Sequence, residues 1–427
     1  MKLLKSKKRV NYWISKNQIP LGLTKNKEII WKRFTFKSDS LIFSARPGIG
    51  KSVMLKSFYF WLFQNQRPLI VFDPEGLDHR LSYFPNSHAL KLPPDTKPWG
   101  IKKLDSGQRA YYFTISKNPM PHERKFIPAL STFGVKELRS LGFSPGAIRK
   151  FLNLLEEYGP FKDFETLMDF IHKFPIREDI AERYQRNMPF LLHNKNYLPN
   201  DVILSSTKNN MVQHLYSIMQ EGIFSLNPED DVSFIDLIKK GHSVFLSFDG
   251  HYDVCRAMVG KIAGEVISYL KYLEDIGERD TFGQPWFIFE EMDGIIPRNP
   301  EPYEEPIVET LAQLILRFRK LSVGMAGACP SLTSLNKKVA QGFHEYIFGR
   351  FAGTELTEIA SITQENSIIS LVNNLYWNRH VNGGAGEREV LYVTELKQKY
   401  KIDPFECPCE IHREPTKVRK HESSDIL

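Results

Sequence analysis

Hydrophobic residues in this chain form short runs that alternate with longer amphipathic stretches. The runs that predict buried strands lie at 29–36, 40–44, 68–73, 110–115, 243–248, 286–289, 323–328, 346–350 and 389–393. Helices are predicted between several of these runs, at 53–63, 258–273 and 306–319. Because strands that alternate with helices build a mostly parallel sheet covered on both faces, we predict an α/β fold.

A stretch with a different pattern interrupts this alternation. Apolar residues recur at helical spacing in 151–155, 164–174 and 211–219, and short Pro or Gly breaks separate these segments. We therefore predict an all-α insertion domain. The resulting division is a basic N-terminal segment at 1–37, an α/β core at 38–118 and 232–396, the helical insertion at 119–231 and a C-terminal tail at 397–427.

The segment ARPGIGKS, at 45–52, fits the phosphate-binding loop pattern, with Ala45 in place of the first Gly. It lies between a predicted strand and a predicted helix, which argues against the alternative of a Gly-rich turn that binds nothing. Backbone N–H groups would wrap a triphosphate at the positive end of the helix. Lys51 would contact the β- and γ-phosphates, and the Ser52 hydroxyl would bind Mg²⁺. The predicted cofactors are ATP and Mg²⁺, and the predicted binding residues are Ala45, Arg46, Pro47, Gly48, Ile49, Gly50, Lys51, Ser52 and Val53.

Two carboxylates that hydrolysis would need follow the apolar run at 286–289. Glu290, in a position where Asp is usual, would hold Mg²⁺ directly or through water. Glu291 would polarise the attacking water and is the predicted catalytic base. Asp293 is either a reserve carboxylate or a turn residue before Gly294.

Composition bounds the class of protein. With 427 residues, the chain is long enough for two or more domains. No apolar run reaches the roughly 18–20 residues that a membrane span needs, and the N-terminus lacks the apolar region of a signal peptide. Its four cysteines are too few for a disulfide framework at this length. We therefore expect a cytoplasmic protein, and peripheral attachment to a membrane complex stays open.

The net charge of +7 is unevenly distributed. Residues 1–37 contain eleven Lys or Arg and one acid, Glu28, a balance of +10, which leaves −3 for the rest. This favours a polyanion partner, and a solvated tail is the alternative. Cys407, Cys409 and His412 offer three metal ligands, but their spacing is too tight for an ordinary zinc module and a fourth ligand is missing.

In the order and spacing of its motifs, the chain resembles the HerA/FtsK superfamily of P-loop ATPases, which pump DNA and include conjugative coupling proteins. Besides the phosphate loop and the acidic pair, the resemblance rests on the segments 19–22, 72–76, 243–250, 316–320, 323–331 and 348–350. It covers roughly 19–396 without the insertion. It implies a RecA-like core, a homo-oligomeric ring that is a hexamer in this family, and DNA gripped through its phosphates without sequence readout.

The resemblance also assigns candidate residues around the γ-phosphate. Arg319 would be an arginine finger that acts on a neighbouring subunit's nucleotide, with Arg317 and Arg350 as alternatives. Where the family has a sensor Gln, this chain has Cys329, Pro330 and Ser331. Either Ser331 substitutes for the amide, or the coupling that the amide provides is weakened or rerouted.

Two functional hypotheses follow. The first is an ATP-hydrolysing, ring-forming motor that translocates DNA in conjugative transfer, repair or packaging, with the helical insertion as a contact for substrate or a protein partner. The second is a nucleotide-gated assembly or binding module with little hydrolysis. The departures at Glu290 and at the sensor position motivate the second hypothesis.

Overall fold

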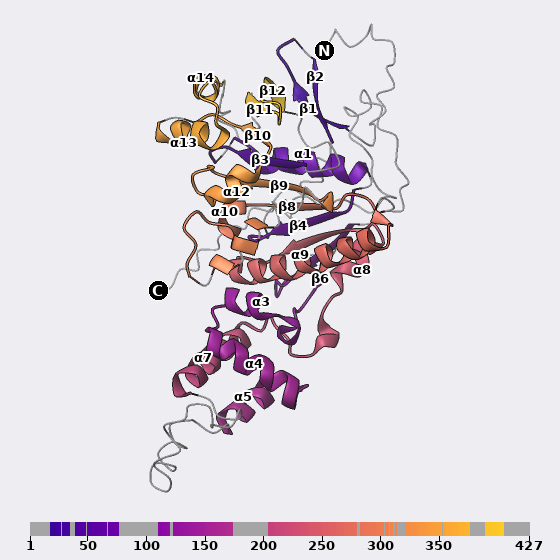
Figure 1. Cartoon of the computed structure of the whole chain (residues 1–427), viewed down its shortest axis with the longest axis vertical. Helices are drawn as coiled ribbons and strands as arrows, with labels where there is room; N and C mark the ends of the chain where they lie inside the picture. The colour runs from indigo at the N-terminus through magenta and orange to yellow at the C-terminus, as the bar shows by residue number, and fades with distance from the viewer. Residues whose placement is uncertain are drawn as a thin grey trace, which may run out of the picture.

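The computed structural model describes most of the α/β core and much of the helical segment. The described residues are 18–26, 28–34, 39–47, 49–65, 67–76, 110–119, 123–173, 204–279, 282–302, 304–306, 308–310, 312–313, 321–351, 353–375 and 389–404. Figure 1 shows a large sheet with helices packed against it and a group of helices beyond one end.

One mixed sheet organises the described chain. Its strands are β1 (Gln18–Leu23), β2 (Ile29–Arg33), β3 (Ser40–Ser44), β4 (Leu69–Asp73), β5 (Ala110–Thr114), β6 (Glu123–Lys125), β7 (Ser243–Ser247), β8 (Trp286–Phe289), β9 (Gly324–Cys329), β10 (Glu345–Phe348), β11 (Val390–Val393) and β12 (Lys399–Pro404). They lie in the order β2-β1-β12-β11-β10-β3-β9-β8-β4-β7-β5-β6. Pairing is parallel from β10 to β6 and antiparallel from β10 to β2. The predicted α/β fold with a mostly parallel sheet is confirmed.

Alternating side chains of the central strands pack into two separate cores, one on each face of the sheet. On β3, Leu41 and Phe43 join the core that contains α1 (Lys51–Gln64), whereas Ile42 joins the core that contains α9 (Tyr252–Asp275). This alternation follows from the pleat, which sends successive side chains to opposite faces. Helices on both faces explain why these strands are apolar along their whole length.

The remaining helices complete the covering and the helical segment. They are α3 (Val135–Ser140), α4 (Pro145–Tyr158), α5 (Phe164–Lys173), α7 (Ser205–Glu221), α8 (Phe234–Lys239), α10 (Met292–Ile295), α12 (Lys337–Gly342), α13 (Thr354–Thr363) and α14 (Ile368–Asn373). Within the described part of the chain, no helix is both long and apolar enough to cross a membrane.

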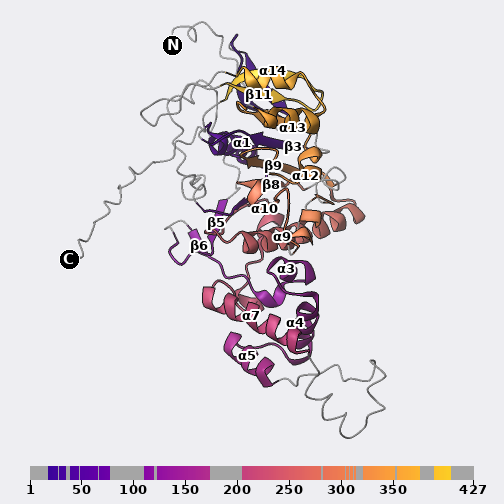
Figure 2. The same ribbon diagram turned by 90° about the vertical axis from the view of Figure 1, so that its left-hand side faces the viewer.

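The helical segment predicted between the two halves of the α/β pattern is present as α3, α4, α5 and α7. Both views place these helices together beyond α9, at the lower end of the molecule (Figures 1 and 2). Their apolar side chains, such as Leu138 and Phe151, belong to the same continuous core as α9 and one face of the sheet. An ion pair between Lys261 on α9 and Asp231 adds a polar connection at this junction.

Three strands were not predicted from the hydrophobic pattern. β12 lies within the segment assigned to the C-terminal tail, yet it pairs with β1 and β11. Of its six residues only Ile402 and Pro404 are buried, so its sequence lacks the apolar run of a core strand. β1 carries Pro20 in its interior, and β6 has only three residues. Edge and hairpin strands are held by backbone pairing, which leaves a weak signal in side-chain polarity.

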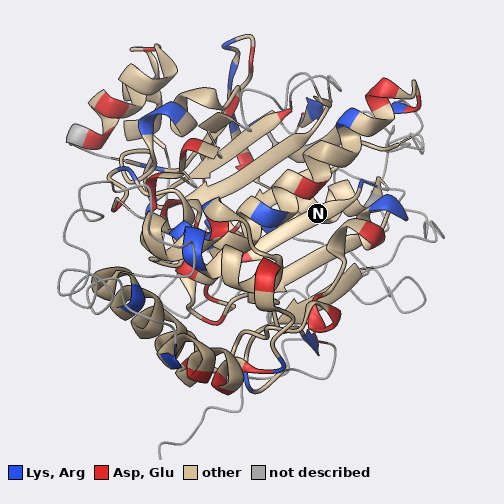
Figure 3. Ribbon diagram, turned by 60° about the horizontal axis from the view of Figure 1, so that its bottom comes forward, with Lys and Arg blue, Asp and Glu red and all other residues tan. Residues whose placement is uncertain are grey.

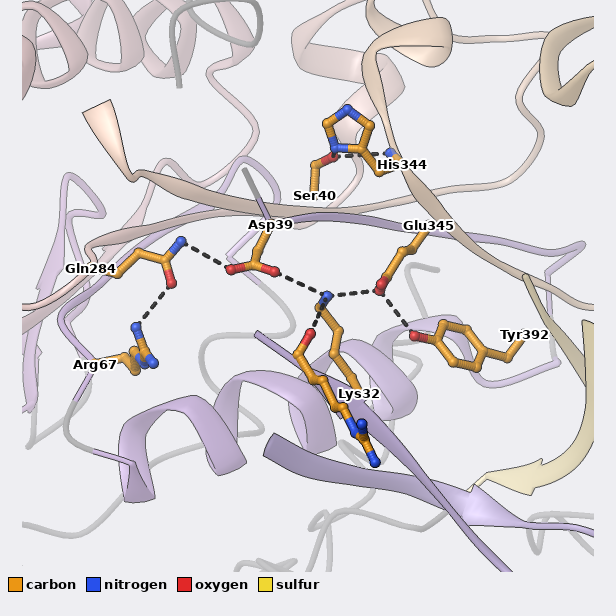
Figure 4. Close-up of polar contacts among 9 residues, drawn as sticks. Lys32, Asp39, Ser40, Arg67, Gln284, His344, Glu345 and Tyr392 are labelled. Atoms are coloured by element: carbon orange, nitrogen blue, oxygen red, sulfur yellow. Dashed lines mark hydrogen bonds and ion pairs between the residues drawn. The ribbon is translucent and has the colours of Figure 1, made fainter. Parts of the chain in front are cut away.

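A buried polar network joins the antiparallel end of the sheet to its parallel centre (Figure 4). Lys32 on β2 is 1% exposed, and its Nζ lies 2.8 Å from Glu345 Oε2 and 3.3 Å from Asp39 Oδ1. Gln284 donates to the other oxygen of Asp39 and accepts from Arg67. Two cations and two carboxylates therefore balance within one connected cluster at the amino-terminal ends of β3 and β10.

Candidate nucleotide-binding site

The phosphate loop connects the end of β3 to the start of α1. Gly50 caps α1 with φ 86° and ψ 35°, a left-handed conformation that glycine adopts without the steric cost of a Cβ atom. The loop is anchored beside two strands, because Ala45 N–H donates to the Cys329 carbonyl at 3.4 Å and Gly349 N–H donates to the Ser44 carbonyl at 2.9 Å. The loop therefore has the strand–turn–helix geometry predicted from its sequence.

The unusual Ala45 fits because the neighbouring strand ends in a glycine. Ala45 is fully buried, and a Cβ added at Gly349 would lie 2.5 Å from the Ala45 methyl group. Two such carbon atoms cannot approach so closely. The missing side chain at Gly349 thus compensates for the methyl group at Ala45, a relation that only the spatial neighbourhood of β3 and β10 reveals.

The amino-terminal turn of α1 presents the residues predicted to bind phosphate and Mg²⁺. Lys51 and Ser52 are half-buried, and Val53 is 36% exposed. The first turn contains no acidic residue. Its backbone N–H groups and the positive end of the helix dipole therefore favour an anion. Of the other predicted loop residues, Arg46 and Pro47 are exposed, Ile49 is buried, and Gly48 lies outside the described residues.

The acidic pair lies at the same edge of the sheet as the phosphate loop. β3 and β8 both pair in parallel with β9, so their carboxyl ends face the same way. Glu290 follows β8, is 1% exposed, and donates its N–H to the Phe72 carbonyl at 3.0 Å. With Ser52, it supplies the hard oxygen donors that Mg²⁺ prefers, so the donor set fits the predicted cofactor.

Asp293 shares the electrostatic environment of Lys51. Burial raises the pKa of Asp293, while a hydrogen bond from Ser334 and the positive charge of Lys51 act in the opposite direction. The same lysine charge acts on Cys329. The reserve carboxylate of the sequence analysis is therefore within electrostatic range of the phosphate-loop lysine.

Glu291 adopts a left-handed backbone conformation, with φ 47°, between β8 and α10. The Tyr252 hydroxyl lies 3.0 Å from Glu291 Oε2 and 3.1 Å from Glu75 Oε1. The pKa of Glu291 is raised to about 7, chiefly by burial; Glu75 and Asp293 also raise it, whereas the hydrogen bond from Tyr252 lowers it. Glu75 lies in the segment 72–76, which carries part of the family resemblance, but neither Glu75 nor Tyr252 was among the predicted site residues.

The residues at the sensor position, Cys329 to Ser331, lead into a turn that is held by local hydrogen bonds. Burial raises the pKa of Cys329, the last residue of β9, to about 12. Ser331 Oγ accepts from Thr333 N–H at 3.1 Å, and the Ser331 carbonyl accepts from Ser334 Oγ at 2.7 Å. Ser334, which sequence analysis did not single out, is the residue here that contacts Asp293.

The candidate arginine fingers are only partly covered by the structure. Arg319 and Arg317 fall in 314–320, outside the described residues, and so do Cys407, Cys409 and His412. Arg350 follows β10 and is exposed. Among the described residues, no group of three His, Cys, Asp or Glu side chains could hold a metal ion. The trans role of Arg319 stays a prediction.

Charge on the described body is mixed. In Figure 3, Lys and Arg residues are interspersed with Asp and Glu on the elements seen from that side. Six of the eleven basic residues in 1–37 fall within 1–17, outside the described residues. The expected polyanion contact of this segment therefore stays a prediction.

Comparison with solved structures supports the fold. VirB4 of Thermoanaerobacter pseudethanolicus matches 91% of this chain and 96% of its own, with a TM-score of 0.53 and 12% identity. The bacterial conjugative coupling protein TrwB matches 88% of this chain and 80% of its own, at TM-score 0.44 and 15% identity. The genome packaging NTPase B204 of Sulfolobus turreted icosahedral virus 2 matches 86% of this chain and 98% of its own, at TM-score 0.35 and 9% identity. The last two TM-scores are too low to support an argument.

No protein-family model matches the chain, and no curated protein matches it in sequence. At 12% identity the likeness to VirB4 concerns the fold alone. The chain therefore has the α/β, RecA-like fold that its phosphate loop and strand order predicted.

Proposed function

We propose that this chain binds ATP with Mg²⁺ at the edge formed by β3, β9 and β8 and hydrolyses it. The observation that carries the proposal is the position of the phosphate loop and of the Glu290–Glu291 pair on either side of one strand, β9, with their strands parallel. A nucleotide held by the loop would direct its γ-phosphate toward the acidic pair, as phosphoryl transfer requires.

Each residue has a distinct task in this proposal. Lys51 neutralises charge on the β- and γ-phosphates, and the N–H groups around Gly50 bind their oxygens. Ser52 and Glu290 would hold Mg²⁺, which supplies charge neutralisation at the phosphates when bound. Glu291 accepts a proton from the attacking water.

The motor role rests on further inferences. In this proposal the subunits form a homo-oligomeric ring, expected to be a hexamer. Arg319 of one subunit reaches the nucleotide of the next. Hydrolysis would drive DNA through the ring in conjugative transfer, repair or packaging. The fold likeness to VirB4 and the basic segment 1–37 support this direction. The helical segment would contact the substrate or a protein partner.

A second candidate is a nucleotide-gated assembly module with little turnover. The specific observation in its favour is the turn at Cys329–Ser331, where the resemblance leads one to expect a Gln and where the Ser331 hydroxyl accepts a hydrogen bond from Thr333. Without an amide near the γ-phosphate, nucleotide binding would still order the site, but coupling to hydrolysis would be weaker.

ATP hydrolysis measured without DNA, with single-stranded DNA and with double-stranded DNA separates the two candidates. The motor predicts DNA-stimulated hydrolysis that is lost in Lys51→Ala and Glu291→Gln, together with a particle mass of several subunits. ATP binding without hydrolysis under all three conditions would reject the motor and favour the assembly module. Loss of ATP binding in Lys51→Ala but not in Glu291→Gln would assign the two residues to binding and chemistry respectively.

A further inference from the structure

We propose that Tyr252 is a positioning residue that orients the carboxylate of Glu291 for activation of the attacking water. This inference rests on the proposed hydrolytic function and adds a residue to its site. Tyr252 is the first residue of α9, whereas Glu291 follows β8, so the pair joins two elements that are distant in sequence.

The hydrogen-bond geometry fixes one oxygen of the base. The Tyr252 hydroxyl lies 3.0 Å from Glu291 Oε2 and 3.1 Å from Glu75 Oε1. Burial and the two carboxylates raise the pKa of Tyr252, so the phenol keeps its proton and acts as a donor. When the phenol donates its hydrogen bond to Glu291 Oε2, the second oxygen of the carboxylate is left to accept a proton from water.

The aromatic ring of Tyr252 is also held in place, by packing against Gly294. A Cβ added at Gly294 would lie 2.2 Å from Tyr252 Cε1, so the ring packs directly on the glycine backbone. One turn further along α9, Arg256 Nη2 donates to the Gly294 carbonyl at 2.8 Å and pairs with Glu304 at 2.7 Å. Two successive turns of α9 thus contact the segment that carries Glu291.

Backbone hydrogen bonds also fix Tyr252 relative to Glu75. The turn before α9 donates from Gly250 N–H to the Pro74 carbonyl at 2.8 Å, and Phe248 N–H donates to the Asp73 carbonyl at 3.0 Å. The carbonyls that accept these bonds immediately precede Glu75 in the chain. Donor and acceptors are therefore held before substrate arrives, which is the condition for a preorganised catalytic group.

The expected effect is on turnover rather than on binding. A misplaced catalytic group costs on the order of 100-fold in rate, so Tyr252→Phe should lower kcat by about 10- to 100-fold. It should leave the KM for ATP and the calorimetric affinity for ATP with Mg²⁺ close to those of the wild type, because the phenol is not part of the phosphate loop. Tyr272→Phe, on the same helix at a side chain that is 57% exposed, is the matched control and should change neither value.

A second variant keeps the inference testable if Tyr252→Phe does not fold. Gly294→Ala retains the hydroxyl but pushes the ring away from its seat, so it should also lower kcat while ATP affinity persists. Wild-type or higher kcat in Tyr252→Phe would overturn the positioning role even though the protein hydrolyses ATP. A wild-type chain whose hydrolysis does not exceed that of Glu291→Gln would instead overturn the proposed function, and the role of Tyr252 with it.

Discussion

The substitution Lys32→Met tests whether the buried network holds the antiparallel strands to the core. Lys32 is 1% exposed and lies within 3.3 Å of two carboxylates, Asp39 and Glu345, which are also buried. Met matches the length and apolar stem of lysine but removes the ammonium group. It leaves two like charges facing each other, with Gln284 and Tyr392 as hydrogen-bond donors to them.

The expected loss of stability follows from the burial of Lys32 and its partners. Removing one partner of a buried ion pair costs about 3–5 kcal/mol, because the remaining charge is left uncompensated. Lys25 provides a matched control on the same hairpin, since its Nζ lies 3.3 Å from Glu389 but its side chain is 78% exposed. An exposed pair contributes about 0–1 kcal/mol, so Lys25→Met should change stability little.

The pH dependence of the stability loss in Lys32→Met provides an independent test of the same reasoning. Burial lowers the pKa of Lys32, but the carboxylates of Glu345 and Asp39 outweigh burial, and the net pKa is raised. In the wild type, the stabilisation by Lys32 is therefore present below the ordinary lysine pKa and is lost only in strongly alkaline solution. Burial already raises the pKa of Glu345, an effect that Lys32 opposes. Without Lys32 that pKa should rise further, so the deficit of Lys32→Met should shrink as pH falls from about 7 toward 4.

Urea denaturation followed by circular dichroism measures these free energies of unfolding. We expect Lys32→Met to lose several times more stability than Lys25→Met, and Lys32→Met combined with Glu345→Gln to recover much of that loss, because replacing both partners removes the uncompensated charge. Equal losses in the two single variants, or a deficit of Lys32→Met that grows as the solution is acidified, would refute the reasoning.

Three further predictions concern other parts of the structure. Gly349→Ala should weaken ATP binding about tenfold in calorimetry, because its methyl group would meet Ala45 at 2.5 Å, and adding Ala45→Gly should restore much of the affinity, leaving only the looser contact with Ile49 at 3.0 Å. Since burial raises the pKa of Cys329, peptide mass spectrometry should find this thiol unlabelled by iodoacetamide at neutral pH until the protein unfolds; labelling of the native protein would contradict its burial. Lys261→Met should speed hydrogen exchange in the segment around its partner Asp231, whereas Lys271→Met, on the same helix, should not.

The sequence predicted the parts of the fold that depend on local hydrophobic pattern. The buried strands β3, β4 and β8 and the buried helix α1 were identifiable because their apolar runs are short, continuous and bounded by turn residues. β12 was not, because its place in the sheet comes from backbone pairing, with β11 in a hairpin and with β1, which is distant in sequence.

The candidate site divides in the same way. Lys51 and Glu291 stand in local motifs whose chemistry can be read from a few neighbouring residues. Tyr252 carries no such signal, since a tyrosine at the start of a helix is ordinary, and its relation to Glu291 depends on how α9 crosses the end of β8. Gly349 matters through its close approach to the Ala45 methyl group, just beyond the end of the adjacent strand β3, and to the Ile49 side chain. Residues that act through contacts between strands or helices therefore required the structure.

The Lys32 network, which contributes to stability, and the phosphate loop lie at opposite ends of β3 and β10. β3 and β10 begin beside the Lys32 network, with Ser40 and Glu345, and their other ends flank the phosphate loop. A strand of five residues spans about 16 Å, and charges that far apart interact weakly where water reaches one of them, as it does at the half-buried Lys51. The charge change in Lys32→Met should therefore lower stability while leaving ATP affinity unchanged in the protein that remains folded. A loss of ATP affinity in that variant would mean instead that the strands transmit a shift in register to the loop, so that the network takes part in the function of the site.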